Sequence, residues 1–215
     1  MADQERHTER GTTGTIRTYL FDVFLTLDKL PVEKIGRAVG VLEEARSKGR
    51  RVFTFGNGGS AATASHFACD LAKGAASHDR PGLRAFCVND SIPLTTAWAN
   101  DTDYENVFSA QILGLAEPGD VAAAADGNGN SPNVLNGARA ARIRGATTIG
   151  LSGFDGGRLQ TLVDIAIVVP NHVMEQVEDA HLLVGHVITT CLRQTGRKTE
   201  ATPEAVPVKT GALAR

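Results

Sequence analysis

The sequence predicts an α/β fold in which a parallel sheet is covered by helices on both faces. Five short apolar segments alternate with longer segments whose apolar residues recur at helical spacing. Parallel strands that are buried on both faces are nearly continuous in apolar residues, and the intervening helices provide the crossovers that such strands need. The five expected strands are residues 50–57, 83–90, 119–126, 146–153 and 164–170.

The first half of the chain begins with two expected helices. Residues 15–29 and 31–48 both carry apolar side chains at helical spacing, and Gly49 ends the second helix. The first strand then passes through a Gly-rich turn into an alanine-rich helix at residues 60–73. Two short helices follow the second strand, at residues 93–99 and 104–115.

The second half repeats the alternation. The third strand ends in another Gly-rich loop, and Pro132 marks the start of a helix that extends to residue 144. A short segment at residues 155–160 separates the last two strands, and a long helix at residues 174–194 closes the pattern. Residues 1–12 and 196–215 lack this periodicity, so they are predicted to be disordered. Residues 13–195 are expected to form a single domain, which suits the chain length of 215 residues.

The composition narrows the class of protein. Apolar residues make up 42% of the chain and charged residues 21%, and no apolar run approaches the roughly 20 residues that span a bilayer. A net charge of -2 and the absence of a basic stripe argue against nucleic acid as a partner. The polar first residues do not resemble a secretory signal, which predicts a cytoplasmic protein. A small-molecule ligand is therefore expected, with no nucleic acid and no membrane.

The first Gly-rich turn, Gly56-Asn57-Gly58-Gly59-Ser60, lies between a strand and a helix. Such a turn lets the backbone approach a ligand and aims amide groups at an anion, so it suits a phosphate or sugar hydroxyl groups. The pattern G-x-G-x-x-A also permits a dinucleotide, but no acidic residue closes a strand about 20 residues later. A turn with a purely structural role is the remaining alternative.

Two pairs of polar residues indicate a metal or acid–base site. His66 and Asp70 are four residues apart on the side of their helix that faces away from its apolar stripe. Glu178 and His186 share one side of the final helix, about 12 Å apart along its axis. A single ion between the last two would need His66 and Asp70 to complete its coordination. Solvated ion pairs on the helix surface are the alternative interpretation.

The second Gly-rich loop, from Asp126 to Ser131, offers polar groups at the start of a helix. Asp126 conflicts with a phosphate ligand because like charges repel. Either its side chain turns away from the ligand, or the ligand group at this loop is not a phosphate.

Several separated segments together resemble one family. They are GNGGSAATASHFACDL, AWAND, GNGNSPNV, LSGFDGGRL and VEDAHLLVGH, in this order along the chain. They are similar to the sugar isomerase (SIS) domain family, in particular to its phosphoheptose (sedoheptulose 7-phosphate) isomerase branch, and the similarity extends to about residue 194. The resemblance implies a flavodoxin-like three-layer sandwich with a five-stranded parallel sheet and extra N-terminal helices. It also implies a homotetramer with sites at subunit interfaces, and interconversion of a ketose and an aldose phosphate through an enediol.

By resemblance, each candidate residue receives a role. The metal ligands, for zinc or another divalent ion, are His66, Asp70, Glu178 and His186. Asp70 is the expected base with Glu178 as its rival, and His186 would carry a proton between the two reacting oxygens. The substrate-binding positions are Asn57, Gly58, Gly59, Ser60, Asn100, Asp101, Asp126, Gly127, Asn128 and Ser131, with the phosphate at Ser60 and Ser131.

The chain departs from the family pattern at four of these positions. Asp70 replaces a Glu, Glu178 replaces a Gln, and Asp126 and Asn128 replace hydroxyl residues of the phosphate loop. The expected substrate is therefore sedoheptulose 7-phosphate or a related heptulose or octulose phosphate. A non-catalytic module that binds a sugar phosphate or docks a protein is the alternative function.

Overall fold

The computed structural model describes residues 2–195, with side chains from Gly11 onward, and contains one five-stranded parallel sheet. The strands are β1 (Arg51–Gly56), β2 (Arg84–Cys87), β3 (Val121–Ala125), β4 (Thr147–Ser152) and β5 (Ile165–Val168). Their order in the sheet is β2-β1-β3-β4-β5, and every neighbouring pair is parallel. The predicted fold class and all five strands are confirmed.

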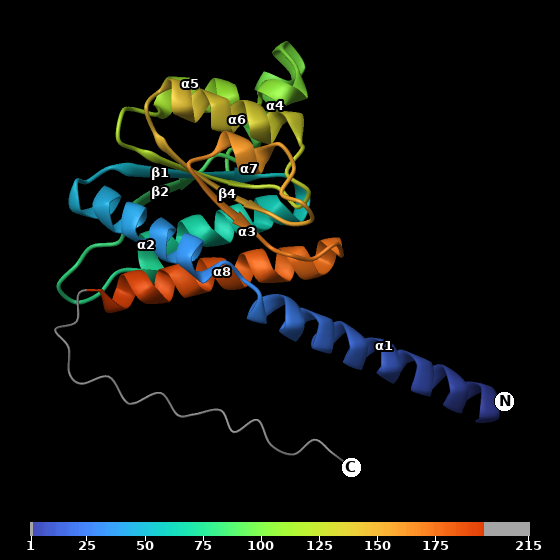
Figure 1. The fold of residues 1–215 in the computed structure, drawn as a ribbon. Coiled ribbons are helices and arrows are strands. Elements are labelled where there is room, and N and C mark those ends of the chain that lie inside the picture. Colours follow the sequence, from blue (N-terminus) through green and yellow to red (C-terminus); the bar gives the residue numbers. More distant parts are fainter. Residues whose placement is uncertain (1, 196–215) are drawn as a thin grey trace.

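Helices cover both faces of the sheet and make three layers (Figure 1). One face packs against α2 (Val32–Ser47), α3 (Gly58–Cys69) and α8 (Met174–Gln194). The other face packs against α5 (Ser109–Leu115), α6 (Pro132–Ile143) and the short α7 (Leu159–Leu162). Alternate residues of β3 contribute to the two cores, because successive side chains of a strand point to opposite faces. The short helix α4 (Ile92–Asp101) has no buried residue.

The order of the strands reverses between β1 and β3, so the crevice between their carboxyl ends is the favoured ligand position in a sheet of this kind. Gly56 at the end of β1 is in register with Ala125 at the end of β3. A Cβ atom at Gly56 would lie 2.6 Å from the carbonyl oxygen of Ala125, so only glycine permits this close approach. The two Gly-rich loops therefore begin side by side.

The first helix, α1 (Ala2–Asp28), projects away from the sheet and its covering helices (Figure 1). It includes residues 2–12, which differs from the predicted disorder and agrees with the helix-forming Ala, Gln, Glu and Arg residues of this segment. The predicted disorder of residues 196–215 lies outside the described residues. Tyr19 donates a 2.7 Å hydrogen bond to Asp179 of α8, and this bond is the main reason that the pKa of Tyr19 is raised to about 12. Within residues 2–195, no helix combines the length and apolarity that crossing a membrane requires.

The helix that begins at Gly58 changes geometry at Asp70. The sequence predicts one continuous helix to residue 73, whereas the structure has the α-helix α3 to Cys69 followed by a π-helical turn, η1 (Asp70–Gly74). The amide of Ala75 donates a 2.7 Å bond to the carbonyl of Asp70, five residues earlier, which closes the wider turn. Such turns contain one residue more than an α-turn and are frequent at functional sites.

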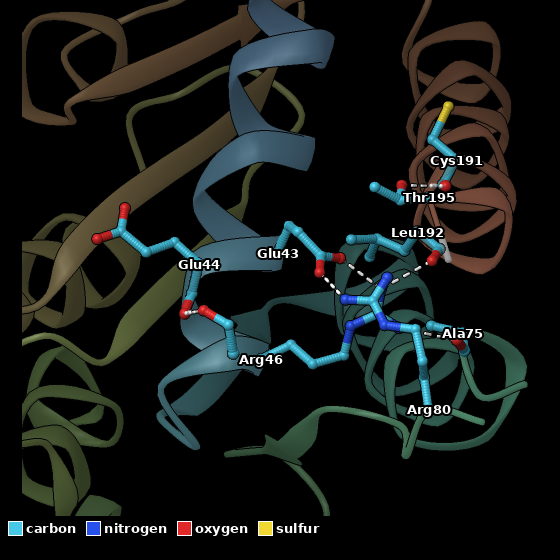
Figure 2. A network of polar contacts seen from close by, with 9 residues as sticks. Glu43, Glu44, Arg46, Ala75, Arg80, Cys191, Leu192 and Thr195 are labelled. Carbon is cyan, nitrogen blue, oxygen red and sulfur yellow. Dashed lines mark hydrogen bonds and ion pairs between the residues drawn. The ribbon is translucent and has the colours of Figure 1, made fainter. Parts of the chain in front are cut away.

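A buried arginine connects the end of this turn to α2 and α8 (Figure 2). Arg46 of α2 has a side chain only 4% exposed, and it pairs with Glu43, which also pairs with Arg80. Its guanidinium donates to the carbonyls of Ala75, at 3.1 Å, and Leu192, at 2.8 Å. Burial lowers the pKa of Arg46. The network fixes the end of η1 against the last turns of α8.

His181 on α8 is fully buried, and neither of its ring nitrogens makes a well-formed hydrogen bond within the described residues. Burial lowers the pKa of His181 from 6.5 to about 4, and a contact with the Ser152 backbone offsets only part of this shift. The folded protein therefore contains a neutral imidazole in a pH range where the unfolded chain binds a proton.

We expect the free energy of unfolding to fall as the pH is lowered from about 6.5 to about 4, by up to about 3 kcal/mol from His181 alone. The sign follows from the lowered pKa, since protonation in this range favours the unfolded chain. Urea unfolding between pH 7.5 and pH 5 measures the slope, and His181→Leu should make it shallower. An equal slope in the variant would contradict this assignment.

Candidate active site

Three of the four predicted metal ligands lie together where α3 and α8 pack. His66 is near the end of α3, Asp70 opens η1, and His186 extends from the middle of α8. The Nε2 atoms of the two histidines are 3.1 Å apart. Asp70 Oδ2 lies 3.6 Å from His66 Nε2 and 3.7 Å from His186 Nε2. We refer to these three side chains as the His–Asp triangle.

The close packing of the two helices has a local cause. Gly185 lies against the ring of Phe67, where a Cβ atom would come within 3.3 Å of the ring. Since Gly185 and Phe67 adjoin His186 and His66 in sequence, the missing side chain lets the two imidazoles meet. Both histidines are exposed and Asp70 is half-buried, so the triangle opens toward solvent in the single chain.

The donor atoms of the triangle fit a zinc ion. Tetrahedral zinc with bonds of about 2.0–2.1 Å holds its ligand atoms about 3.4 Å apart. The three distances of the triangle, 3.1, 3.6 and 3.7 Å, are close to this value and describe one face of a tetrahedron. Two imidazoles and one carboxylate with a fourth position left over are the pattern of a catalytic zinc site.

Glu178, on α8, lies apart from the triangle, and its carboxylate reaches the beginning of α3. A Cβ atom at Gly59 would lie 2.3 Å from Glu178 Oε2, so the carboxylate rests directly on this glycine. Gly59 precedes His66 by seven residues, about 10 Å along a helix. The structure thus brings together three of the four predicted ligands and places Glu178 beside the first Gly-rich loop.

The first loop is joined to α6 by a pair of amides. Asn57 Nδ2 donates to Asn133 Oδ1, and Asn133 Nδ2 donates to Asn57 Oδ1, both at 2.8 Å. The hydroxyl of Tyr104, in the turn η2 (Tyr104–Asn106), also donates to Asn57 Oδ1, at 3.1 Å. Sequence reasoning missed Asn133 and Tyr104. An asparagine directly after Pro132, in the first turn of the expected helix, is the one sequence signal that could have indicated Asn133.

The remaining residues of the first loop shape its turn. Gly58 has a φ of +53°, a conformation that favours glycine, and it lies between Asn57 and the first turn of α3. Ser60 is buried in that turn.

Hydrogen bonds between Asp126 and Ser131 join the two ends of the second loop. Its carboxylate accepts hydrogen bonds from the backbone amide of Ser131, at 2.7 Å, and from the Ser131 hydroxyl, at 2.9 Å. Gly127 lies against Met174, where a Cβ atom would be 2.2 Å from the sulfur. The side chain of Asn128 is exposed and accepts a bond from the amide of Asn130. Of the predicted substrate positions in this loop, Asn128 is therefore the most accessible.

Asn100 and Asp101 are exposed at the end of α4 and hydrogen-bond to each other at 2.9 Å. Among residues 11–195, no hydrogen bond connects either side chain to the two Gly-rich loops. The helix itself packs on η2, which carries Tyr104. The predicted Asn-Asp pair is thus near the first loop in the fold but not part of its hydrogen-bond network.

Comparison with known proteins places this arrangement in context. The family described as the SIS domain matches residues 20–153. The phosphoheptose isomerase of Aquifex aeolicus is 35% identical over 167 residues, which cover 78% of this chain and 87% of that protein. That of Paramagnetospirillum magneticum is 38% identical over 156 residues, covering 73% and 81%.

Two solved structures of phosphoheptose isomerases are also similar to this chain. The phosphoheptose isomerase of Neisseria gonorrhoeae superposes with a TM-score of 0.78 at 27% identity, covering 86% of this chain and 97% of that one. That of Francisella tularensis has a TM-score of 0.80 at 24% identity, covering 87% and 98%, and supports the fold.

Proposed function

Because the chain belongs to the SIS domain family and, within it, to the phosphoheptose isomerase branch, we propose that it interconverts a ketose and an aldose of a long-chain sugar phosphate, such as sedoheptulose 7-phosphate. The observation that carries this proposal is the His–Asp triangle, which combines a carboxylate and two imidazoles in mutual contact. Aldose–ketose conversion needs this chemistry, because one proton moves between carbons and another between oxygens.

In the proposed mechanism, Asp70 removes a proton from the carbon next to the ketose carbonyl, and the resulting enediol is reprotonated on the neighbouring carbon. Asp70 is the carboxylate that contacts both histidines, whereas the carboxylate of Glu178, on α8, lies against Gly59, which is about 10 Å from His66 along α3. His186, whose ring is exposed, transfers the hydroxyl proton between the two oxygens through Nδ1, the nitrogen that would not hold the ion. Glu178 and the two Gly-rich loops would orient the rest of the sugar.

We propose zinc as the cofactor, held by His66, Asp70 and His186. The spacing of their ligand atoms supports this choice, as does the preference of zinc for imidazole and carboxylate ligands. When bound, the ion would act as a Lewis acid that stabilises negative charge on the enediol oxygens.

We further propose a homotetramer with its sites at subunit interfaces. Leu20, Phe21 and Phe24 of α1 are each more than half exposed on a helix that projects from the sheet (Figure 1). Exposed apolar patches of this kind mark association surfaces. We place the protein in the cytoplasm, because phosphorylated sugars are too polar to leave it by diffusion.

The proposed activity is tested by solvent exchange. Incubation with sedoheptulose 7-phosphate and zinc in D2O should introduce deuterium at the reacting carbons, as followed by NMR, together with formation of an aldose. His186→Ala should lose most of this exchange. If no ketose phosphate of six to eight carbons exchanges, the chain is a binding module rather than an isomerase.

A further inference from the structure

We infer that Asn133 of α6 is a positioning residue: it holds the side chain of Asn57 in the one orientation that presents a hydrogen-bond donor to the sugar phosphate. The inference rests on the proposed isomerase function and deepens it, because it assigns substrate binding a support outside the residues that touch the substrate. Asn133 is 2% exposed, whereas Asn57 is half-buried, so Asn57 is the member of the pair that a ligand can reach.

The backbone amide of Val134 settles how the two side-chain amides face each other. This N–H group can only donate, and it donates to Asn133 at 3.0 Å, so the atom that it meets is Oδ1. Asn133 Nδ2 is then the atom that faces Asn57 Oδ1, and Asn57 Nδ2 faces Asn133 Oδ1, both at 2.8 Å. The orientation of Asn57 thus follows from a donor that is fixed in the main chain.

One hydrogen of Asn57 Nδ2 remains for a ligand. A side-chain amide nitrogen carries two hydrogens, and among residues 11–195 Asn57 Nδ2 donates only to Asn133. Asn57 Oδ1, in contrast, accepts from both Asn133 and Tyr104, which occupies its two lone pairs. Asn57 therefore meets a ligand as a hydrogen-bond donor, which suits the phosphate and hydroxyl oxygens of a sugar phosphate.

The same network keeps Asn57 from capping its own helix. Asn57 directly precedes the first turn of α3, a position from which an asparagine side chain usually accepts from the second or third helical amide. Here it makes no such bond, because its Oδ1 is turned toward Asn133 and Tyr104. The amides of Gly59 and Ser60 are thereby free of a side-chain cap and available to a ligand oxygen.

The main chain around Asn57 is held by other contacts. Asn89, just after β2, accepts from the amide of Gly56 at 3.2 Å and donates to its carbonyl at 2.9 Å. The carbonyl of Asn57 accepts from the amide of Ala61 in the first turn of α3, at 3.1 Å. Loss of Asn133 would therefore release the side chain of Asn57 and leave the turn in place. A released Asn57 could cap α3, which would turn its donor away from the ligand.

A double-mutant cycle tests whether Asn133 acts through Asn57. Sedoheptulose 7-phosphate is titrated calorimetrically into the zinc-loaded wild type, Asn57→Ala, Asn133→Ala and the double variant. Each single substitution should raise Kd about fivefold, the loss typical of one hydrogen bond. The double variant should bind within about twofold of Asn57→Ala, because without Asn57 there is no side chain to position.

Independent effects would multiply to about 25-fold in the double variant, and this result would overturn the inference. So would an unchanged Kd in Asn133→Ala. Circular dichroism verifies that each variant folds. Should the cavity left by alanine unfold the chain, Asn133→Leu takes its place in the cycle, because leucine retains the volume of the side chain and removes its hydrogen bonds.

Kinetics separate positioning from a general structural defect. Asn133→Ala should raise KM about fivefold and change kcat less than about twofold, because the acid–base groups of the His–Asp triangle lie on other elements. Tyr104→Phe, which leaves the amide pair intact, should raise KM less than Asn133→Ala does. A fall in kcat with an unchanged KM would contradict the assignment.

Asn136→Ala is the matched control. Asn136 lies three residues further along α6, and its side-chain amide donates to the carbonyl of Glu105 instead of to Asn57. This variant also loses a hydrogen bond between α6 and a neighbouring segment, so it should resemble Asn133→Ala only if the effect is structural. We expect its KM and Kd to stay within twofold of the wild type.

Failure of the proposed function gives a different result, namely no deuterium exchange in the wild type. The titrations then decide the inference alone, because they require binding and no turnover. A non-additive cycle would support Asn133 as a positioning residue in a binding module. A wild type that binds no sedoheptulose 7-phosphate would overturn the inference as well.

Discussion

Replacing Asp70 by Asn should lower kcat for the isomerisation by about a thousandfold, because a positioned general base contributes about 10²–10⁴-fold to such a rate. Asp70 is the carboxylate that lies within 4 Å of both histidines of the triangle. Asparagine preserves its volume and one oxygen, so the change removes basicity with little effect on packing. Steady-state kinetics with the ketose phosphate, and loss of deuterium exchange, measure the effect.

Glu178→Gln is the matched control for this prediction. Its carboxylate rests on Gly59 at the start of α3, away from the triangle, so we expect a higher KM and a change in kcat of less than about tenfold. Zinc content should be measured in both variants, since loss of the ion from Asp70→Asn would assign the effect to metal binding. The reverse pattern would make Glu178 the base, and near-normal turnover in both variants would refute the mechanism.

Replacing Arg46 by Ala should lower the free energy of unfolding by about 3 kcal/mol, the cost typical of removing one partner of a buried ion pair. The carbonyls of Ala75 and Leu192 would lose their donor, and Glu43 would keep only Arg80 (Figure 2). Urea unfolding at neutral pH measures the change. Lys48→Ala is the control, because its pair with Glu44 is exposed and screened by solvent, so its loss should change the free energy of unfolding far less.

Arg46→Ala should also lower kcat, because Arg46 holds the turn that begins at Asp70. The kinetic measurement belongs well below the unfolding temperature, where the variant is folded. Equal stabilities of Arg46→Ala and Lys48→Ala would show that the buried network contributes no more than a surface pair.

The layers of the fold could be predicted because each strand has a strong local signature. The strand Val121–Ala125 is buried at every position, and its sequence is accordingly a continuous apolar run. Gly or Pro marks the ends of the neighbouring helices. The predicted disorder of residues 2–12 differs from the structure because the prediction rested on the polarity of this segment. Polarity does not exclude a helix made of good helix formers.

The candidate site could be predicted only in part. The spacing of His66 and Asp70 indicates a shared helix face, but the sequence assigned Glu178 and His186 to the same ion. Glu178 and His186 are eight residues apart on α8, which separates them by about 12 Å. The packing of α3 on α8 brings His186 to His66 and leaves Glu178 against Gly59. Contacts between loops, such as Asn57 with Asn133, depend on the register of β1 and β3 and have no local signature.

The π-turn at Asp70–Gly74 makes the site depend on the number of residues in the chain as well as on their identity. A turn of this type arises when one residue is added to a regular helix. Deleting a single residue, for example Ala72, would restore regular winding and rotate Gly74 and Ala75, which follow the deletion, away from α8 and Arg46. The number of residues in this segment is thus constrained. The identity of the side chain at position 72 is not, because Ala72 is exposed.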